Sequence, residues 1–294
     1  MMFADDFDTA RVVTSGAEIN LVHGGSGSPL LLLHGYPQTH VIWHEVASQL
    51  AQSFHVICPD LRGYGDSSKP PSTPDHHPYS KRAMAQDMAE VMTSLGYQEF
   101  LVAGHDRGAR VTHRMALDYP ARVEKACVMD IAPTHLMFKT ADQNFATGYY
   151  HWFFLIQPDG LPEHMIGADP AYYLSEKLRR WGAPGAVFSD EAVAEYVRCF
   201  SNPEAIHASC EDYRAAASID IDHDNSDFGR KLAMPVLALW ANQGAVGRCF
   251  DPLALWQQRA DTVQGTVLDA THYMAEEIPG QIAELMVAFF KENG

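Results

Sequence analysis

The fold is indicated most clearly by the stretch Phe100-Leu101-Val102-Ala103-Gly104-His105-Asp106-Arg107-Gly108-Ala109-Arg110-Val111. In this stretch an apolar run is followed by an aspartate with glycines on both sides and then by a helical pattern. The continuous apolar run at 100–103 is typical of a strand covered on both faces of a parallel sheet. The G-x-D-x-G turn that follows is strained, so it needs small residues on both sides of Asp106. The pattern predicts a strand, a sharp turn and a helix, with Asp106 in the position of a nucleophile.

Outside this stretch, apolar runs alternate with helix-length patterns. This alternation predicts an α/β fold with a mainly parallel central sheet flanked by helices. The candidate strands are residues 17–22, 30–33, 55–59, 100–103, 125–130, 236–240 and 265–268.

The segment 134–219 has a different character, since it is rich in aromatic residues and helix formers and holds no clear strand. We interpret it as a helical cap inserted into a core made of residues 1–133 and 220–294. Pockets often form at such subdomain boundaries. The alternative is a set of extra helices that pack on the sheet edge without a function of their own.

Two further motifs agree with a nucleophile at Asp106. The strand at 30–33 ends in His34-Gly35-Tyr36-Pro37, and this turn can direct the Tyr36 N–H at an oxyanion, together with the N–H of Arg107. His272 follows the last candidate strand, where a catalytic histidine is expected. We therefore predict His272 as the base.

The acid that would orient His272 is less obvious. The loop after the strand 236–240 reads Ala241-Asn242-Gln243-Gly244 and offers no carboxylate. Asp130, at the end of the preceding core strand, is therefore the predicted partner, with Asp251 as the fallback. The structural alternative for Asp130 is a helix cap or a loop salt bridge.

A carboxylate nucleophile changes the expected chemistry. Aspartate can displace a leaving group at a saturated carbon and form an ester on Asp106. Water activated by His272 then attacks the carbonyl of that ester and releases an alcohol. Carbon–halogen bonds and epoxides suit this route, whereas ordinary esterase activity is not expected.

Bulk composition excludes several other classes. The formal charge of −16 argues against nucleic-acid or anionic-membrane partners and would repel an anionic substrate unless local cations offset it. No run approaches the length of a membrane span, and the acidic start lacks the features of a signal peptide. Five scattered cysteines without a C-x-x-C pair favour a reducing cytoplasm and suggest no zinc cluster. We expect no metal and no organic cofactor.

With these residues placed, the chain resembles the haloacetate (fluoroacetate) dehalogenases of the α/β-hydrolase superfamily. The resemblance covers nearly the whole chain and is most specific at three motifs, which are Gly104-His105-Asp106-Arg107-Gly108-Ala109-Arg110, Tyr150-His151-Trp152 and Cys210-Glu211-Asp212-Tyr213-Arg214. It implies an α/β-hydrolase fold with a cap, a small anionic haloacid as substrate, and a homodimer.

The resemblance also implies roles for the matched residues. Arg107 and Arg110 would hold the substrate carboxylate, and their i, i+3 spacing on a starting helix supports a shared face. The alternative for these arginines is a salt bridge to core acids. His151, Trp152 and Tyr213 would bind the halide, although spacing alone favours core packing for His151 and Trp152. Trp181 is expected to line the same pocket.

Three functions are compared. The first is hydrolysis of fluoro- or chloroacetate to glycolate and halide. The second is an epoxide hydrolase with the same Asp-His-Asp triad, in which Tyr213 and a second tyrosine (Tyr149, Tyr150 or Tyr172) protonate the epoxide oxygen. The third is an α/β-hydrolase scaffold without activity that serves for binding or as a receptor, which the complete triad disfavours. The sequence does not separate release of fluoride from release of chloride or bromide alone.

Overall fold

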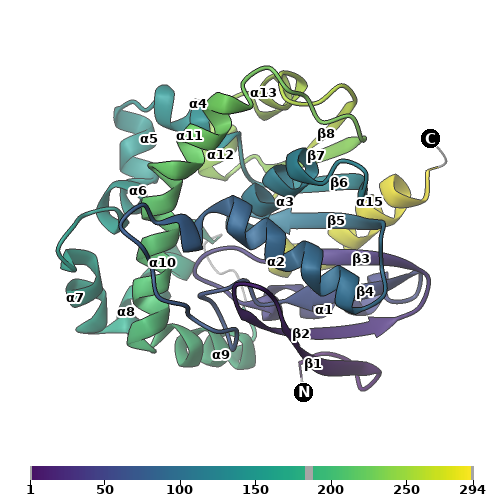
Figure 1. Cartoon of the computed structure of the whole chain (residues 1–294), viewed down its shortest axis with the longest axis horizontal. Coiled ribbons are helices and arrows are strands. Elements are labelled where there is room, and N and C mark those ends of the chain that lie inside the picture. Colours follow the sequence, from purple (N-terminus) through teal and green to yellow (C-terminus); the bar gives the residue numbers. More distant parts are fainter. Residues whose placement is uncertain (1, 183–187, 293–294) are drawn as a thin grey trace.

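The computed structural model describes residues 2–182 and 188–292 and contains one eight-stranded sheet (Figure 1). The strand order is β1-β2-β4-β3-β5-β6-β7-β8. The pairs β1–β2 and β2–β4 are antiparallel, and all the other neighbours are parallel. The strands are β1 (Phe7–Val13), β2 (Glu18–Gly25), β3 (Ser28–Leu33), β4 (Phe54–Pro59), β5 (Phe100–His105), β6 (Val123–Met129), β7 (Val236–Ala241) and β8 (Val263–Leu268).

The predicted α/β class with a mainly parallel sheet is confirmed, and all seven candidate strands are present with ends shifted by a few residues. The strand missed by the sequence analysis is β1. It lies at the sheet edge, pairs only with β2, and exposes most of its side chains. An edge strand of this kind carries too few apolar residues to produce a clear signal.

Helices cover both faces of the sheet. On one face α2 (Lys81–Ser94) packs beside α3 (Arg107–Asp118), and on the other α1 (His44–Leu50) packs beside α15 (Pro279–Lys291). Every residue of β5 is buried, which explains why its sequence is apolar without alternation. The Asp106 turn therefore follows a strand at the centre of the layered core.

The described chain between β6 and β7 consists mainly of helices, and Figure 1 shows them gathered beyond one end of the sheet. The last of these helices begins at residue 219, the predicted boundary, and continues beyond it. It packs against the first helix of the group and against the longest one. They are α4 (Thr134–Lys139), α5 (Gln143–Gly148), α6 (Tyr150–Leu155), α7 (Leu161–Gly167), α8 (Pro170–Trp181), α9 (Asp190–Phe200), α10 (Pro203–Ala216) and α11 (Ile219–Ser226).

Five short helices complete the described chain. They are the two 3-10 helices His40–Trp43 and His77–Tyr79, and the pair α12 (Ala245–Cys249) and α13 (Pro252–Gln257), with α14 (Met274–Glu277) leading into α15. Within the described ranges, no helix is both long and apolar enough to cross a bilayer.

Candidate active site

Asp106 occupies a strained turn at the carboxyl end of β5. Its φ of 47° lies in a region that residues other than glycine rarely adopt, and α3 begins at the next residue. A Cβ at Gly108 would lie 2.4 Å from the carbonyl oxygen of Leu33, so only glycine lets the helix approach β3 this closely. The fold thus holds one carboxylate in a fixed direction at the top of the sheet.

The H-G-x-P turn lies directly beside this carboxylate. The Tyr36 N–H donates a hydrogen bond of 3.1 Å to Oδ2 of Asp106. A Cβ at Gly35 would lie 2.5 Å from the Cβ of Asp106, so this close approach also requires glycine. Burial alone would raise the pKa of Asp106, but the charges of His272, His105 and the two arginines of α3 outweigh it and lower that pKa. Asp106 is therefore an anion at neutral pH.

His272 and Asp130 form a close pair beside Asp106. Nδ1 of His272 lies 2.6 Å from Oδ2 of Asp130, and Oδ1 of Asp130 accepts the N–H of Ala241 at 3.2 Å. The loop after β7, which lacks an acid, thus contributes a backbone donor instead. The fallback Asp251 is exposed and caps α13 by accepting the N–H of Ala254, so it is not the partner of His272.

The pairing sets the protonation of His272. Burial would lower the pKa of His272, but the hydrogen bond and the charge of Asp130 raise it, and the net change is upward. Nε2 of His272 is buried and has no hydrogen-bond partner among the described residues. Nδ1 is held by Asp130, so Nε2 is the atom free to exchange a proton with a bound water.

Further buried polar atoms near Asp106 have no hydrogen-bond partner within the described residues. They are Nδ1 of His151, Nε1 of Trp152, the hydroxyl of Tyr213, one terminal nitrogen (NH1) of Arg107 and Nε of Arg110. Buried polar groups are normally paired, because an unpaired one costs roughly 1–3 kcal/mol. A cluster of unpaired ones indicates a site for a polar ligand.

Ring contacts join the aromatic members of this cluster to the triad. The ring of His151 lies 4.5 Å from that of Trp181 and 5.5 Å from that of Tyr213, centroid to centroid. Trp152 lies 6.4 Å from Tyr213, and Trp181 lies 5.3 Å from His272. The structure therefore brings together residues from α6, α8 and α10 that the sequence analysis connected only through a resemblance.

The two arginines of α3 have different surroundings. Arg107 donates to both carboxylate oxygens of Asp212 and to its carbonyl oxygen, at 2.6–2.9 Å, so only one terminal nitrogen remains. Nε and NH2 of Arg107 therefore form a two-bond fork with Asp212, and this fork is not available to a substrate. Arg110 binds the carbonyl oxygen of Ala132 and the hydroxyl of Thr134 and contacts no acid within the described chain. Arg110 is the cation of this pair whose charge is not offset by a contacting carboxylate.

A cavity of about 540 Å³ opens onto the nucleophile. Asp106, His151, Trp181 and His272 line it, together with Tyr149 and Tyr150 and with three arginines nearer the surface, which are Arg179, Arg180 and Arg248. Trp181 is thus one of the lining residues of this cavity. Tyr172 is 65% exposed and is not among the lining residues, so it is not a candidate proton donor.

A larger hollow of about 720 Å³ lies along α7 and α10 and does not include Asp106. Its polar residues, such as Glu163 and Arg214, are paired with one another. No three described histidine, cysteine or acidic side chains are grouped closely enough to hold a metal ion. The cavity at Asp106 is thus where the reactive groups converge.

Sequence reasoning missed two buried groups near the site. Asp212 holds Arg107, and Lys177 lies unpartnered over the rings of Tyr150 and Trp181 at 3.9 and 4.7 Å. Asp212 lies inside one of the motifs that carry the resemblance, but nothing in the sequence indicated that Arg107 would be its partner. Lys177 gave no signal, because a lysine in an amphipathic helix is normally solvated.

The strand order and the strained turn that carries Asp106 are those of an α/β-hydrolase. The chain belongs to this family, whose sequence profile, described as alpha/beta hydrolase fold, matches residues 28–264. Within it, the chain belongs with the haloacetate (fluoroacetate) dehalogenases. It is 43% identical over 289 residues to the fluoroacetate dehalogenase of a Burkholderia sp, covering 98% of this chain and 95% of that protein.

Other relatives are also close. The soluble epoxide hydrolase of Corynebacterium sp. (strain C12) is 34% identical over 287 residues, which cover 95% of this chain and 96% of that one. The crystal structure of an α/β hydrolase from Nostoc sp PCC 7120 is 56% identical, with a TM-score of 0.98 over the whole of both chains. The chain is therefore similar in sequence both to a dehalogenase and to an epoxide hydrolase.

Proposed function

We propose that this protein hydrolyses haloacetates to glycolate and halide through an ester on Asp106. The observation that carries the proposal is the ring of buried, unpartnered polar atoms around an ionised Asp106. These atoms come from α3, α6 and α10, and their chemistry suits a ligand that presents a carboxylate at one end and a halogen at the other.

In the first step, Asp106 displaces the halide. The N–H of Tyr36 holds Oδ2, which leaves Oδ1 of Asp106 to attack the carbon that bears the halogen. The carbon–halogen bond breaks with its electron pair on the halide, and a carboxymethyl ester forms. The N–H and O–H groups of Trp152 and Tyr213, together with His151, receive the halide. Donors that strengthen as charge builds on a leaving group act mainly in the transition state.

In the second step, water cleaves the ester. Nε2 of His272 takes a proton from the water, and Asp130 stabilises the imidazolium that forms. The hydroxide adds to the carboxyl carbon of Asp106, and the backbone N–H groups of Tyr36 and Arg107 stabilise the oxyanion. Collapse of this intermediate releases glycolate and restores the Asp106 carboxylate, while His272 returns its proton to solvent.

The arginines of α3 account for an anionic substrate on a chain of charge −16. The charges of Arg107 and Arg110 both lower the pKa of Asp106, so both act electrostatically at the nucleophile. Inside a buried site such charges are weakly screened, and they can outweigh the more distant surface acids.

An epoxide hydrolase is the second candidate, because Tyr149 lines the cavity with Asp106. With Tyr213 it would form a pair of phenols able to protonate an epoxide oxygen. The 34% identity to a soluble epoxide hydrolase adds support. The two buried arginines argue against a neutral substrate. The homodimer and the division into core and cap stay predictions.

The deciding experiment measures fluoride and chloride release from fluoroacetate and chloroacetate side by side, with diol formation from styrene oxide as the comparison. We expect halide release at least tenfold faster than diol formation. Diol formation without halide release would replace the proposal by the second candidate.

A further inference from the structure

We propose that Lys81 and Asp212 are positioning residues, which aim the free nitrogen of Arg107 at the substrate carboxylate. The inference rests on the proposed function, because it assigns a role within the same site. Arg107 has 0% exposure, and most of its N–H groups donate to Asp212.

The contact between Arg107 and Asp212 fixes the guanidinium plane. Nε of Arg107 lies 2.9 Å from Oδ2 of Asp212, and NH2 lies 2.6 Å from Oδ1, so the two groups meet as a fork. NH1 is then the nitrogen without a partner, and it is fully buried. The ring of Tyr213 lies 4.2 Å below the guanidinium carbon and limits its tilt. Asp212 thus decides where NH1 points.

This pairing creates an electrostatic problem, because Asp212 cancels the charge of Arg107. Lys81 compensates for this by bringing a second positive charge to the Asp212 carboxylate. Its ammonium donates to Oδ1 of Asp212, and both side chains are almost completely buried. Arg107 and Lys81 together hold the pKa of Asp212 well below its usual range against the effect of burial. Arg107 and Lys81 thus place two positive charges on Asp212, and Asp220, 4.0 Å from the Lys81 ammonium, offsets part of this charge.

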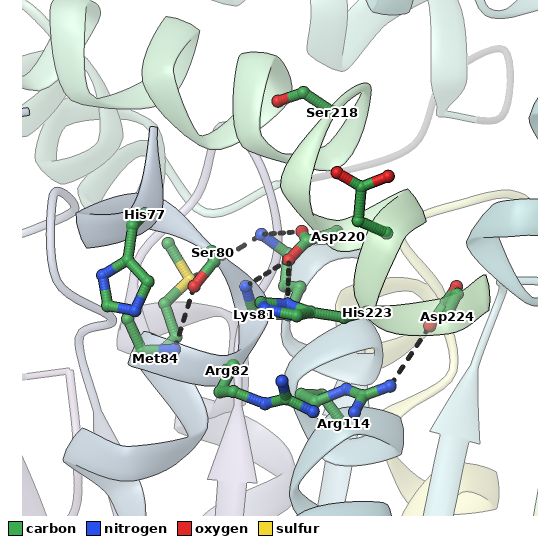
Figure 2. A network of polar contacts seen from close by, with 12 residues as sticks. His77, Ser80, Lys81, Arg82, Met84, Arg114, Ser218, Asp220, His223 and Asp224 are labelled. Atoms are coloured by element: carbon green, nitrogen blue, oxygen red, sulfur yellow. Dashed lines mark hydrogen bonds and ion pairs between the residues drawn. The ribbon is translucent and has the colours of Figure 1, made fainter. Parts of the chain in front are cut away.

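Lys81 is itself held in place by the helical insertion. Its backbone N–H donates to Oδ1 of Asp220 at 2.9 Å, and its ammonium lies 4.0 Å from Oδ2 of the same residue. Figure 2 shows Lys81 and Asp220 facing each other across the start of α2 and α11. Tyr64 adds a hydrogen bond of 2.6 Å from its hydroxyl to Asp212. The network joins the core to α10, which also carries Tyr213.

The geometry also determines how a substrate carboxylate is held. Arg107 offers NH1, and Arg110 offers Nε, since its NH1 already binds Ala132 and Thr134. Each arginine thus offers one nitrogen without a partner, in place of two nitrogens from a single arginine. Such a clamp depends on the relative orientation of two side chains, and for Arg107 that orientation comes from Asp212 and Lys81.

The test replaces Lys81 by methionine and compares charged chloroacetate with neutral chloroacetamide, which has nearly the same shape. We expect Lys81→Met to lower kcat/KM for chloroacetate about tenfold, mainly through KM, and to change that for chloroacetamide less than about twofold. Tyr64→Phe, a milder change that removes one hydrogen bond to Asp212, should shift the ratio in the same direction by less. An unchanged ratio in both variants would overturn the inference.

A double-mutant cycle shows whether Lys81 acts through Arg107. In an Arg107→Met background, Lys81→Met should leave the chloroacetate-to-chloroacetamide ratio unchanged within about twofold. Equal effects in both backgrounds would contradict a positioning role. Arg114→Met is the matched control, because Arg114 is equally buried and forms its own ion pairs with Asp224 (Figure 2) and with Asp227, without contacting Arg107. It should reduce stability and leave the ratio unchanged.

The inference can fail separately from the proposed function. Binding of chloroacetate and chloroacetamide to an Asp106→Asn background, measured by calorimetry, needs no turnover. If the wild type releases no halide, the proposed function fails. Lys81→Met should then still weaken the binding of chloroacetate and leave that of chloroacetamide unchanged. Equal effects on both ligands would contradict the inference.

Discussion

The residues that the sheet supplies to the site and those that the helical insertion supplies differ in hydrogen bonding, although Nε2 of His272 is also unpaired among the described residues. Asp106, Asp130 and His272 each have a partner: the Tyr36 N–H, the Ala241 N–H and the Asp130 carboxylate. In contrast, Nδ1 of His151, Nε1 of Trp152 and the hydroxyl of Tyr213 have none among the described residues.

This difference separates two tasks. A nucleophile and a base need fixed orientation and protonation before substrate arrives, and pairing within the protein provides both. A halide needs donors that are not already engaged, and unpaired donors meet that need at a cost in stability. Mutations on the sheet side should therefore damage catalysis and stability together, whereas those on the insertion side should damage catalysis alone.

The largest effect is expected at the nucleophile. Asp106→Asn removes the attacking oxygen anion, because a carboxamide is a poor nucleophile. Halide release from chloroacetate should fall by roughly 10⁴-fold, the size seen when members of other catalytic triads are removed. A variant that folds normally by circular dichroism yet keeps more than a hundredth of the activity would rule out Asp106 as the nucleophile.

The next effect tests the unpaired donors of the insertion. Tyr213→Phe and Trp152→Phe each remove one predicted halide donor, so kcat with fluoroacetate should fall about 10²- to 10³-fold, by analogy with a lost oxyanion donor. Tyr213→Phe removes only a hydroxyl that has no protein partner, so its melting temperature should stay within about 2 °C of the wild type. A large loss of stability with little loss of activity would reverse the comparison.

The pairing of His272 gives a pH prediction. The reaction needs neutral His272, so activity is lost as the pH falls through its raised pKa. Asp130 is the cause of that rise, and Asp130→Asn should move the acid limb of the kcat profile to lower pH while reducing its maximum. The measurement is kcat with chloroacetate from about pH 5 to about pH 9, a range that spans the ordinary histidine pKa. An acid limb at the same pH in the variant would remove Asp130 from this role.

The smallest effect concerns Lys177, an unpartnered group of the insertion that does not line the cavity. Burial, with help from the charge of Arg180, lowers the pKa of Lys177 to about 7. The unfolded chain therefore binds more protons than the folded one from about pH 7 up to the ordinary lysine pKa, and stability rises with pH across that window. Lys177→Met removes this effect.

The melting temperature of Lys177→Met should exceed that of the wild type by roughly a few degrees near pH 6 and by less at about pH 9. Lower melting temperatures for the variant at both values would show that the aromatic contacts of the charged lysine outweigh its burial.

The two sides of the site also differ in how far the sequence predicts them. Asp106, Asp130 and His272 follow strands, and the order of strands along the chain determines where their carboxyl ends lie. His151 and Trp152 lie in an aromatic helix, where the same letters would equally describe core packing, so only the resemblance assigned them a role. The edge strand β1 was missed for lack of apolar contrast.

The pairing of Arg107 with Asp212 was beyond sequence reasoning for a physical reason. The two residues are 105 positions apart, and their contact depends on how α10 packs against the start of α3. Charge type alone allows Arg107 many acidic partners on a chain with 37 acidic residues. Hence the sequence predicts which groups have reactive chemistry, and the structure shows which of them are already engaged.

The central claim, a covalent ester on Asp106, has a direct test. His272→Asn should block the second step and leave the first intact, so incubation with chloroacetate should release about one chloride per protein and add one carboxymethyl group, as expected for a trapped intermediate. Mass spectrometry should locate the carboxymethyl group on the peptide that contains Asp106. Continued turnover without modification, or a carboxymethyl group on another residue, would contradict it.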